Sequence, residues 1–337
     1  MSRLRTAVVG VGHMGRHHAR ILGEMPEADL VAVVDHDLAR AKEIAERAGT
    51  QAVDDASKIL KHVDAVVVAV PTSFHHAAAS PFLNAGIATL VEKPLATSLH
   101  ESAELVKLAE ASGAVLQVGH SERYNPAWIA AEEDGFEPNF LSAQRFSRYP
   151  FRSIDVSVVL DVMIHDIDLT LSVLGSEIER VEAVGGCVVS PSADWADVSL
   201  LFTNGRRAQL SASRVDTGSS RTMRMSNESG WYEVDFVARS TKHVRYDGNE
   251  SLTSDICASM GPEQREAWWN GSVKTTSRQH DTAAEPLRLE LRDFLSRVEN
   301  GGVPKVSGQA GYAALALALQ IDDQISEAGK SRVRRAA

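Results

Sequence analysis

Short apolar runs alternate with helical patterns through residues 1–122. The apolar runs, such as "DLVAVVD" at 29–35 and "DAVVVAVP" at 64–71, are rich in valine and do not alternate strictly with polar residues. Runs of this kind are typical of strands that are buried on both faces of a parallel sheet. Between them, apolar residues recur with the period of a helix, and these helices are predicted at 38–48, 76–85 and 98–112. The repeated strand–helix units predict an α/β fold built on a parallel sheet.

The pattern changes near residue 139, where long segments with strand character are joined by tight turns. The turns "TNGR" at 203–206 and "ESGW" at 228–231 are typical hairpin connections. One helix, predicted over residues 155–174, interrupts the strands, and two helical segments follow near the C-terminus. This half therefore predicts a large, mostly antiparallel sheet with helices packed against it.

These patterns divide the chain into two predicted domains, in keeping with its length of 337 residues. Residues 1–122 form the α/β domain, and residues 123–337 form an α+β domain. The helix at 308–328 is expected to pack back on the first domain. A large sheet usually leaves one face to cover, so we expect a homo-oligomer, a dimer or tetramer, that forms through the second domain.

Composition excludes several classes of protein. The formal net charge is −10, which argues against a surface that binds nucleic acid, because phosphate backbones select basic surfaces. No apolar run is long enough to span a membrane, and the N-terminus lacks a signal-peptide pattern, so we expect a cytoplasmic protein. The two cysteines, Cys187 and Cys257, are far apart and lack metal-ligand spacing, so we expect neither a disulfide nor a metal site.

A glycine motif lies between the first predicted strand and the first helix, in "VVGVGHMGRHHA" at 8–19. Its spacing, G-x-G-x-x-G, allows a tight turn, close approach of a pyrophosphate, and close packing of the helix on the strand. Asp35 ends the second strand, where a carboxylate can bind both ribose hydroxyls and repels a 2′-phosphate. His36 and Asp37 provide no arginine for such a phosphate, so the motif predicts NAD as cofactor. The predicted contacts are Gly10, Gly12, His13, Met14, Gly15 and Asp35.

The stretch "LDVMIHDIDL" at 160–169 places polar residues inside an apolar helix. Asp161, His165 and Asp168 are spaced at i, i+4 and i+7, so they share one stripe of the helix. The rest of the helix is apolar nearly all round, which is typical of a buried helix. An aspartate one turn from a histidine can orient it as a general base. A satisfied polar network that fixes the helix to the sheet explains the same spacing, and this segment alone leaves both interpretations open.

Further motifs follow in order along the chain: "VPTSFHH" at 70–76, "VEKPLATS" at 91–98 and the D-x-x-x-H-x-x-D segment at 161–168. Together with the glycine motif, this ordered set resembles the Gfo/Idh/MocA family of oxidoreductases. The segment "GHSERYNPA" at 119–127 resembles the branch of nucleotide-sugar 3-dehydrogenases within it. That branch oxidises UDP-N-acetylglucosamine, or its uronic acid, to a 3-keto sugar for a following aminotransferase. The chain departs from the family in having Val158, Val159 and Met163 where glycines are usual.

The resemblance implies hydride transfer from a sugar carbon to the nicotinamide of NAD. It implies that His165, oriented by Asp161, accepts the hydroxyl proton, and that Lys93 hydrogen-bonds the same hydroxyl; the two roles could be exchanged. Further cofactor contacts are expected from Pro71, Thr72, His75, Glu92 and Lys93. Substrate contacts are expected from Lys93, Arg123, Tyr124, Asn125, Arg148, Arg152, Asp161 and His165.

Arg145, Arg148 and Arg152 could bind the UDP pyrophosphate, which needs cations, although arginines on a strand are also typical of its solvated face. Two other functions fit the same fold. A dehydrogenase of a free sugar or inositol would need a neutral polar pocket in place of the arginines. A non-catalytic NAD-binding regulator would not need Lys93, Asp161 and His165 together.

Overall fold

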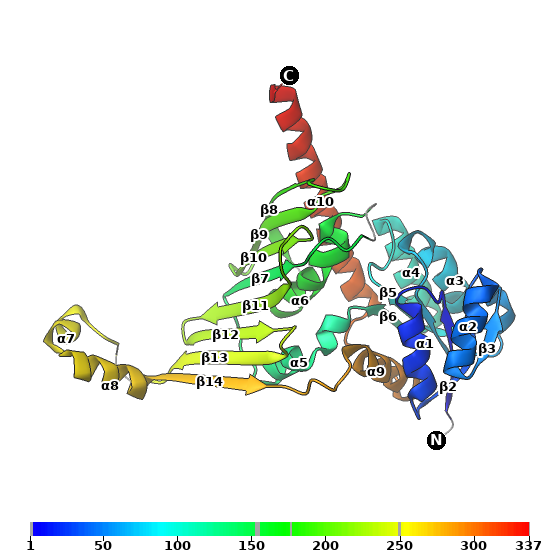
Figure 1. Ribbon diagram of the computed structural model, residues 1–337, viewed down its shortest axis with the longest axis horizontal. Helices are drawn as coiled ribbons and strands as arrows, with labels where there is room; N and C mark the ends of the chain where they lie inside the picture. Colours follow the sequence, from blue (N-terminus) through cyan, green and yellow to red (C-terminus); the bar gives the residue numbers. More distant parts are fainter. Residues whose placement is uncertain (1–2, 152–155, 176, 249–250, 337) are drawn as a thin grey trace. The chain divides into compact units, whose positions relative to one another are not determined.

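The structure is a computed structural model and describes residues 3–151, 156–175, 177–248 and 251–336 (Figure 1). The chain separates into two compact units, each of which is described by itself. The first unit consists of Met1–Tyr124, Ile167–Leu169 and Ala284–Asp323, and the second of Asn125–Asp166, Thr170–Ala283 and Gln324–Ala337. In the described part of the chain, no helix combines the length and the apolar character that crossing a membrane requires.

A six-stranded parallel sheet forms the centre of the first unit, as predicted. Its strand order, β3-β2-β1-β4-β5-β6, is that of a doubly wound dinucleotide-binding fold. The direction of winding reverses between β1 and β4, so the loops after these two strands diverge at the carboxyl edge of the sheet. The strands are β1 (Leu4–Val9), β2 (Ala28–Val34), β3 (Gln51–Val53), β4 (Ala65–Val68), β5 (Ala88–Glu92) and β6 (Leu116–Gly119).

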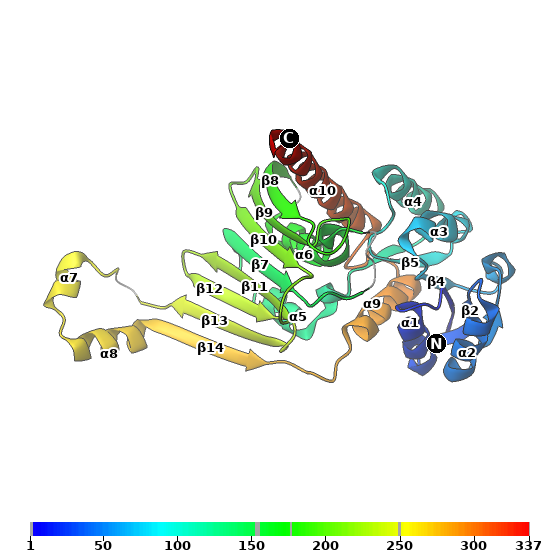
Figure 2. The same ribbon diagram turned by 45° about the horizontal axis from the view of Figure 1, so that its top comes forward.

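Helices cover both faces of this sheet. On one face Leu22 of the first helix and Phe294 of α9 pack against strand residues such as Leu90, and all three are almost fully buried. Burial of each such side chain stabilises the fold by about 1.5–3 kcal/mol. α9 lies beside α1 in Figure 2. The main helices of this unit are α1 (Gly15–Glu24), α2 (Leu38–Ala48), α3 (His75–Asn84), α4 (Leu99–Ser112), α9 (Pro286–Asn300) and the first part of α10 (Gly308–Ala336).

An eight-stranded sheet forms the centre of the second unit, in the order β14-β13-β12-β11-β7-β10-β9-β8. Neighbouring strands run antiparallel except β10 and β7, which are parallel, so the predicted mostly antiparallel sheet is confirmed. The strands are β7 (Phe140–Phe146), β8 (Ile178–Gly186), β9 (Trp195–Phe202), β10 (Arg207–Ser213), β11 (Ser220–Asn227), β12 (Gly230–Asp235), β13 (Ser240–Tyr246) and β14 (Val273–Gln279).

Glycine permits the predicted hairpin between β11 and β12. Gly230 has φ +144°, and a Cβ atom there would lie 2.1 Å from the carbonyl oxygen of Val244 on β13. A side chain at this position would therefore collide with the neighbouring strand. The other predicted turn, at 203–206, connects β9 and β10, and Gly205 adopts φ +81° within it.

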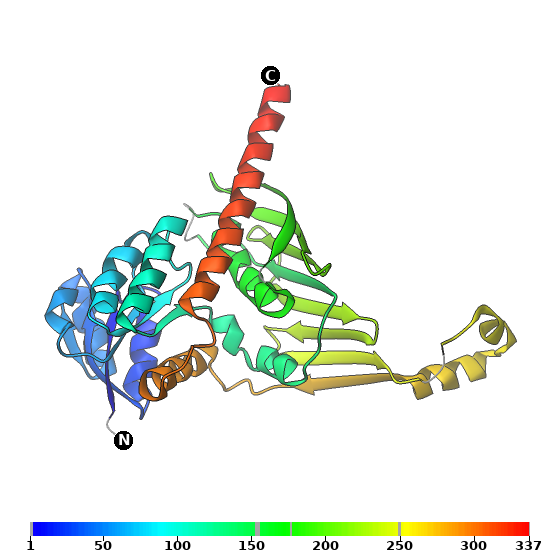
Figure 3. The same ribbon diagram turned by 180° about the vertical axis from the view of Figure 1, so that it is seen from behind.

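One face of the second sheet carries helices, and these are visible from behind in Figure 3. Side chains alternate along β9, where Val198, Leu200 and Phe202 are buried and Asp197 and Ser199 are exposed. This alternation is the pattern of a sheet with one covered face and one open face. The helical segments of this unit are α5 (Pro126–Glu133), η4 (Val159–Met163), most of α6 (Ile164–Leu174), α7 (Ser254–Ser259), α8 (Pro262–Ser272) and the last part of α10.

The single α-helix predicted over residues 155–174 is wrong in its first half. A π-helical segment, Val159–Met163, precedes the α-helix Ile164–Leu174, and residue 155 lies outside the described residues. A π-helix adds a residue to the hydrogen-bonded turn, which the apolar period of the sequence did not reveal. Such segments are frequent at functional sites, and this one contains Asp161.

Candidate active site

The carboxyl ends of the parallel strands meet at one edge of the first sheet. Gly10 follows β1, Asp35 follows β2, and Val70 lies just beyond β4. Glu92 ends β5, and His120 follows β6. In open α/β sheets this edge binds the ligand, at the point where the winding reverses. Most of the cofactor residues predicted from the sequence therefore lie at the edge where the fold binds ligands.

The three glycines of the motif have three different structural roles. Gly10 adopts φ +85°, and a Cβ atom there would lie 2.7 Å from the backbone nitrogen of Val70. A Cβ on Gly15 would lie 1.8 Å from the carbonyl oxygen of Gly10, so only glycine lets α1 begin here. No described atom lies within 4 Å of a Cβ built on Gly12. The open space at Gly12 and the N-terminus of α1 fit a dinucleotide pyrophosphate.

Asp35 is buried and held in place by the backbone. Its Oδ2 accepts a hydrogen bond from the N–H of Val11 (3.0 Å), and its Oδ1 accepts one from the N–H of Asp37 (3.0 Å). Asp35 as a whole is 6% exposed, and burial together with these two hydrogen bonds fixes its carboxylate beside the glycine loop. A fixed carboxylate at this place suits the two hydroxyls of a ribose.

Arg40 lies near the same carboxylate, which sequence reasoning missed. Its Nη1 is 3.6 Å from Oδ2 of Asp35, and its Nη2 is 3.2 Å from Oδ2 of Asp37. The prediction of NAD rested on the two residues that follow Asp35, whereas the first turn of α2 brings Arg40 back toward the strand end. A periodic search along α2 could have found it.

Glu92 and Lys93 end β5 at this edge. Oε1 of Glu92 lies 2.8 Å from Nε2 of His18 on α1, and its side chain lies against Gly119, where a Cβ would be 3.0 Å from Oε2. Burial by itself raises the pKa of Glu92, but the hydrogen bond with His18 and the charge of Lys93 outweigh it and hold this pKa below the ordinary value. Glu92 is thus an anion beside the half-buried Lys93.

His75 connects two loops at the same edge. Its Nδ1 lies 2.9 Å from the carbonyl oxygen of Pro94, and its Nε2 lies 2.9 Å from that of Val70. Burial lowers the pKa of His75, which favours a neutral ring. The side chain fixes the loop after β4 against the turn after Lys93. Pro71 and Thr72 precede it in that loop, and the cofactor contacts predicted for all three stay predictions.

The residues after β6 have protein partners. Nε of Arg123 lies 2.7 Å from Oδ2 of Asp168 in a buried ion pair, which accounts for Asp168, the last residue of the predicted stripe. The hydroxyl of Tyr124 donates to Oδ2 of Asp293 at 2.7 Å, and burial raises the pKa of Tyr124. Oδ1 of Asn125 accepts from the N–H of the first turn of α5, so Asn125 is a helix cap. Substrate contacts from these residues stay predictions.

His120 is a second residue that sequence reasoning missed. His120 is 1% exposed and directly follows β6, the strand that pairs with β5 in the sheet. Burial lowers the pKa of His120, and the charges of Asp168, Arg123 and Lys93 also act on it. Its position after a parallel strand was a usable signal, because carboxyl ends of such strands line ligand sites.

The remaining predicted catalytic residues belong to the second unit. Asp161 lies in the π-helical segment, His165 lies in the first turn of α6, and both are half-buried. The next polar residue, Asp166, forms a buried ion pair with Arg145, whose Nη2 lies 2.7 Å from Oδ1 of Asp166. Arg145 therefore fixes α6 to β7, and this guanidinium, a candidate for the pyrophosphate in the sequence, is buried in the ion pair with Asp166.

The arginines predicted for a pyrophosphate are only partly described. Arg148 is exposed, and its Nε donates to the carbonyl oxygen of Thr217 at 3.0 Å. Arg152 lies outside the described residues. Within the described ranges no group of three or more histidine, cysteine, aspartate or glutamate side chains is arranged to hold a metal ion.

A buried ion pair anchors the segment that leads into the π-helix. Nε of Arg214 lies 2.9 Å from Oδ1 of Asp194, and both side chains are fully buried. Nη1 of Arg214 donates to the carbonyl oxygen of Val156 at 2.8 Å, and the N–H of Val158 donates to the carbonyl oxygen of Ala193 at 2.8 Å. The residues just before Asp161 are therefore held by this pair and by the loop that contains Asp194.

Comparisons with known proteins agree with this geometry. Residues 4–120 match the model of the GFO/IDH/MocA oxidoreductase family with an NAD-binding Rossmann fold, and residues 137–233 match the model of the GFO/IDH/MocA C-terminal domain. The UDP-N-acetylglucosamine 3-dehydrogenase of Acidithiobacillus ferrooxidans is 34% identical over 95% of this chain and 97% of its own length. Its solved structure has a TM-score of 0.86 at 32% identity and covers 96% of this chain and 98% of that chain.

Inositol dehydrogenases are also similar. The inositol 2-dehydrogenase of Rhizobium meliloti is 27% identical over 94% of each chain. A levoglucosan dehydrogenase solved with NADH and L-sorbose shares the fold, with a TM-score of 0.82 at 19% identity over 97% of this chain and 98% of that chain. The dinucleotide-binding edge, the two family matches and the full-length relative agree, and the chain belongs to the Gfo/Idh/MocA family of oxidoreductases.

Proposed function

We propose that the protein oxidises the 3-hydroxyl of a UDP-N-acetylglucosamine-type nucleotide sugar to the 3-keto sugar, with NAD as the hydride acceptor. The observation that carries the proposal is the fixed carboxylate of Asp35 beside an open glycine cradle, in a chain that is 34% identical to a UDP-N-acetylglucosamine 3-dehydrogenase over nearly its full length. A 3-keto sugar is a substrate for transamination, so an aminotransferase would follow in the reaction sequence.

The first unit would hold the cofactor through its own backbone and one carboxylate. The N–H groups at the start of α1 would hold the pyrophosphate, and Asp35 would accept hydrogen bonds from the ribose hydroxyls. Negative charge on Asp35 opposes a 2′-phosphate, which favours NAD over NADP. Asp35 and Lys93 lie on opposite sides of the glycine loop in the strand order, so residues at the ends of β4 and β5 would hold the nicotinamide half.

When bound, the cofactor supplies the ring that accepts a hydride. Lys93 donates a hydrogen bond to the reacting hydroxyl and stabilises negative charge on its oxygen. The negative charge of Glu92 lies beside Lys93 and favours a positively charged lysine, which donates a hydrogen bond and does not accept a proton. We therefore assign proton acceptance to His165. Asp161, one turn earlier, orients the imidazole and stabilises its protonated form.

A second candidate function is oxidation of inositol or a free sugar. It is favoured by the inositol 2-dehydrogenase of Rhizobium meliloti, which matches 94% of this chain. The two functions differ in their substrates, because only a nucleotide sugar carries a pyrophosphate, which needs cations to bind it. Arg148 is exposed and is a candidate for this contact among the described residues. A regulator without catalysis has less support, since Lys93, Asp161 and His165 are all present.

Single-turnover formation of NADH tests this assignment. NAD-loaded protein is mixed with UDP-N-acetylglucosamine, its uronic acid, myo-inositol or glucose, with a trap for the keto product. We expect a signal with a nucleotide sugar, and a loss of about 10²–10⁴-fold in rate for Lys93→Met and for His165→Asn, with NAD still bound. Lys107→Met, an exposed lysine on α4, is the matched control. Unchanged rates in both site variants would contradict the assignment, and a signal with myo-inositol alone would favour the second candidate.

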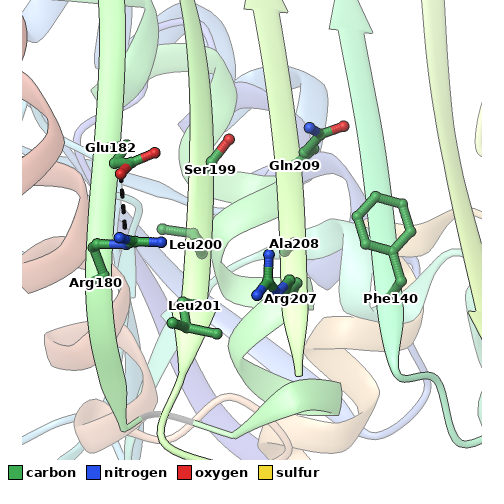
Figure 4. A pocket seen from close by; sticks show the side chains of 9 residues that line it. All are labelled: Phe140, Arg180, Glu182, Ser199, Leu200, Leu201, Arg207, Ala208 and Gln209. Atoms are coloured by element: carbon green, nitrogen blue, oxygen red, sulfur yellow. Dashed lines mark ion pairs between the residues drawn. The ribbon is translucent and has the colours of Figure 1, made fainter. Parts of the chain in front are cut away.

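We further propose that a second copy of this chain covers the open face of the second sheet. Figure 4 shows the residues that line a pocket at this face, which come from β8, β9, β10 and β7. Phe140 and Leu201 are apolar, while the face also carries Arg180, Glu182 and Arg207, and Nε of Arg180 lies 3.5 Å from Oε1 of Glu182. A face with both signs of charge can pair with itself about a two-fold axis.

Light scattering after gel filtration tests this proposal. Phe140→Asp should convert an oligomer to a smaller species, because it places a charge in the apolar part of the interface. The control is Val303→Asp, at a side chain of the first unit that is 75% exposed. A monomeric wild-type protein, or an unchanged mass in Phe140→Asp, would contradict the proposal.

A further inference from the structure

A polar group of side chains interrupts the apolar layer between the first sheet and helices α1 and α9. Along β5, Leu90 faces this layer and Val91 faces the opposite one, so Glu92 points again toward α1 and α9. Along β6, Leu116 and Val118 pack in the opposite layer, so Gln117 also faces α9. The two neighbouring strands thus place a carboxylate and an amide in the same buried layer.

Glu290 of α9 enters this layer from the helix side. It is 0% exposed, and its backbone carbonyl oxygen accepts a hydrogen bond from Nε2 of Gln117 at 3.2 Å. Among the described residues neither oxygen of its carboxyl group has a hydrogen-bond partner. A glutamate whose carboxyl group has no hydrogen-bond partner is unexpected in a layer whose other residues are mostly apolar.

The charges that face Glu290 are mainly negative. Burial raises the pKa of Glu290 well above its ordinary value, and the negative charges of Glu92, Asp168 and Asp293 raise it further. An ionised carboxylate without a partner in this layer would be costly, which favours the protonated form of Glu290. Glu92 differs, because the hydrogen bond with His18 and the charge of Lys93 keep it ionised.

Other ionisable groups surround this pair. His18 comes from α1, Lys93 from the end of β5, and Asp168 from the short part of α6 that belongs to the first unit. The segment after β6 contributes three more, and α9 contributes a second carboxylate. The ionisable residues near Glu290 and Glu92 are His18, His75, Lys93, His120, Arg123, Tyr124, Asp168 and Asp293.

We propose that Glu290 stores a proton for the cofactor site: Glu92 and Glu290 carry one negative charge between them until positive charge is added at the end of β5. The proposal rests on NAD as the cofactor. The oxidised nicotinamide ring is a cation, and its positive charge would favour the ionised form of Glu290 beside that of Glu92. Glu290 would therefore lose its proton to solution as NAD⁺ binds. Hydride transfer neutralises the ring, and Glu290 then takes a proton back from solution.

Proton counting during cofactor binding tests this directly and needs no sugar substrate. Binding of NAD⁺ and of NADH is measured by calorimetry in buffers of different ionisation enthalpy. The wild-type protein should release more protons with NAD⁺ than with NADH, and Glu290→Gln, which keeps shape but cannot ionise, should lose at least half of that difference. Glu299→Gln, an exposed glutamate on the same helix, should match the wild type.

Infrared spectroscopy of the cofactor-free wild-type protein provides a second readout. It should show the carbonyl band of a buried protonated carboxylic acid at neutral pH, and this band should be absent in Glu290→Gln. Equal proton counts in the wild type and Glu290→Gln, no NAD⁺ binding, or no such band in the wild type would each overturn the proposal. If NAD binds with the expected proton release but no sugar is oxidised, the proposed substrate fails and this inference stands.

Discussion

The buried pair of Asp194 and Arg214 gives the strongest stability prediction. Oδ2 of Asp194 accepts hydrogen bonds from three successive N–H groups, of Val188 (2.7 Å), Val189 (2.6 Å) and Ser190 (2.9 Å), while Oδ1 accepts from Arg214 (2.9 Å). Asp194→Asn keeps the shape of the side chain but removes its charge. The guanidinium of Arg214 then stays buried without an anion, and at least one loop N–H loses a charged acceptor.

The expected cost follows from this geometry. Removal of one partner from a buried ion pair costs about 3–5 kcal/mol, because the remaining charge is left uncompensated. That is a large part of the roughly 5–15 kcal/mol by which a folded protein is stable. The exposed pair of Arg245 and Asp247 has the same N–O distance, 2.9 Å, with side chains 55% and 37% exposed. Asp247→Asn should therefore cost no more than about 1 kcal/mol.

Tryptophan fluorescence during urea unfolding suits this measurement. All five tryptophans, at positions 128, 195, 231, 268 and 269, lie in the second unit, so the signal reports the unit that contains Asp194. The double variant Asp194→Asn/Arg214→Met should be less destabilised than the sum of its single variants, since the unpaired cation is gone. A cost for Asp194→Asn below about 1 kcal/mol, equal to that of the exposed control, would refute the reasoning.

Three further predictions concern acid stability and the cofactor site. Burial raises the pKa of Asp194, but the hydrogen bonds from Ser190 and the loop N–H groups outweigh burial and hold this pKa well below the ordinary value. The stabilisation by ionised Asp194 is therefore complete above the ordinary aspartate pKa and is lost as the pH falls toward the lowered pKa. In acid, the free energy of unfolding of Asp194→Asn should therefore fall less steeply with pH than that of the wild type. Asp35→Ser should lower the ratio of the NADP to the NAD dissociation constant by at least about tenfold, because a carboxylate and a phosphate repel by about 1–4 kcal/mol at short range. An unchanged ratio would contradict the role of Asp35. Gly12→Ala should weaken NAD binding by at least about tenfold, while the free energy of unfolding changes by less than about 0.5 kcal/mol. Gly15→Ala should instead impair folding, because its Cβ would lie 1.8 Å from a carbonyl oxygen. Equal effects of the two variants would contradict the proposed pyrophosphate site at Gly12.

Local patterns predicted the features that depend on neighbouring residues in the sequence. The valine-rich runs predicted the parallel sheet, the glycine spacing predicted the loop at its edge, and the hairpin signals predicted turns of the antiparallel sheet. Each depends on backbone preferences or on burial of a whole strand, which short segments encode.

Features that depend on packing could not be predicted in the same way. The partners of Asp166 and Asp168 come from residues 21 and 45 positions earlier, and the spacing along the helix says nothing of them. The role of Asn125 as the cap of α5 was likewise not predicted, and its predicted substrate contact stays a prediction. The burial of Glu290 depends on the packing of α9 on the sheet, which the local sequence does not specify.

The most direct test of the account is single-turnover formation of NADH by NAD-loaded protein with UDP-N-acetylglucosamine or its uronic acid, beside myo-inositol and glucose. The account predicts NADH only with a nucleotide sugar, at a rate reduced by about 10²–10⁴-fold in Lys93→Met. NADH formed with myo-inositol or glucose but with neither nucleotide sugar, or formed as fast in Lys93→Met as in the wild type, would contradict it.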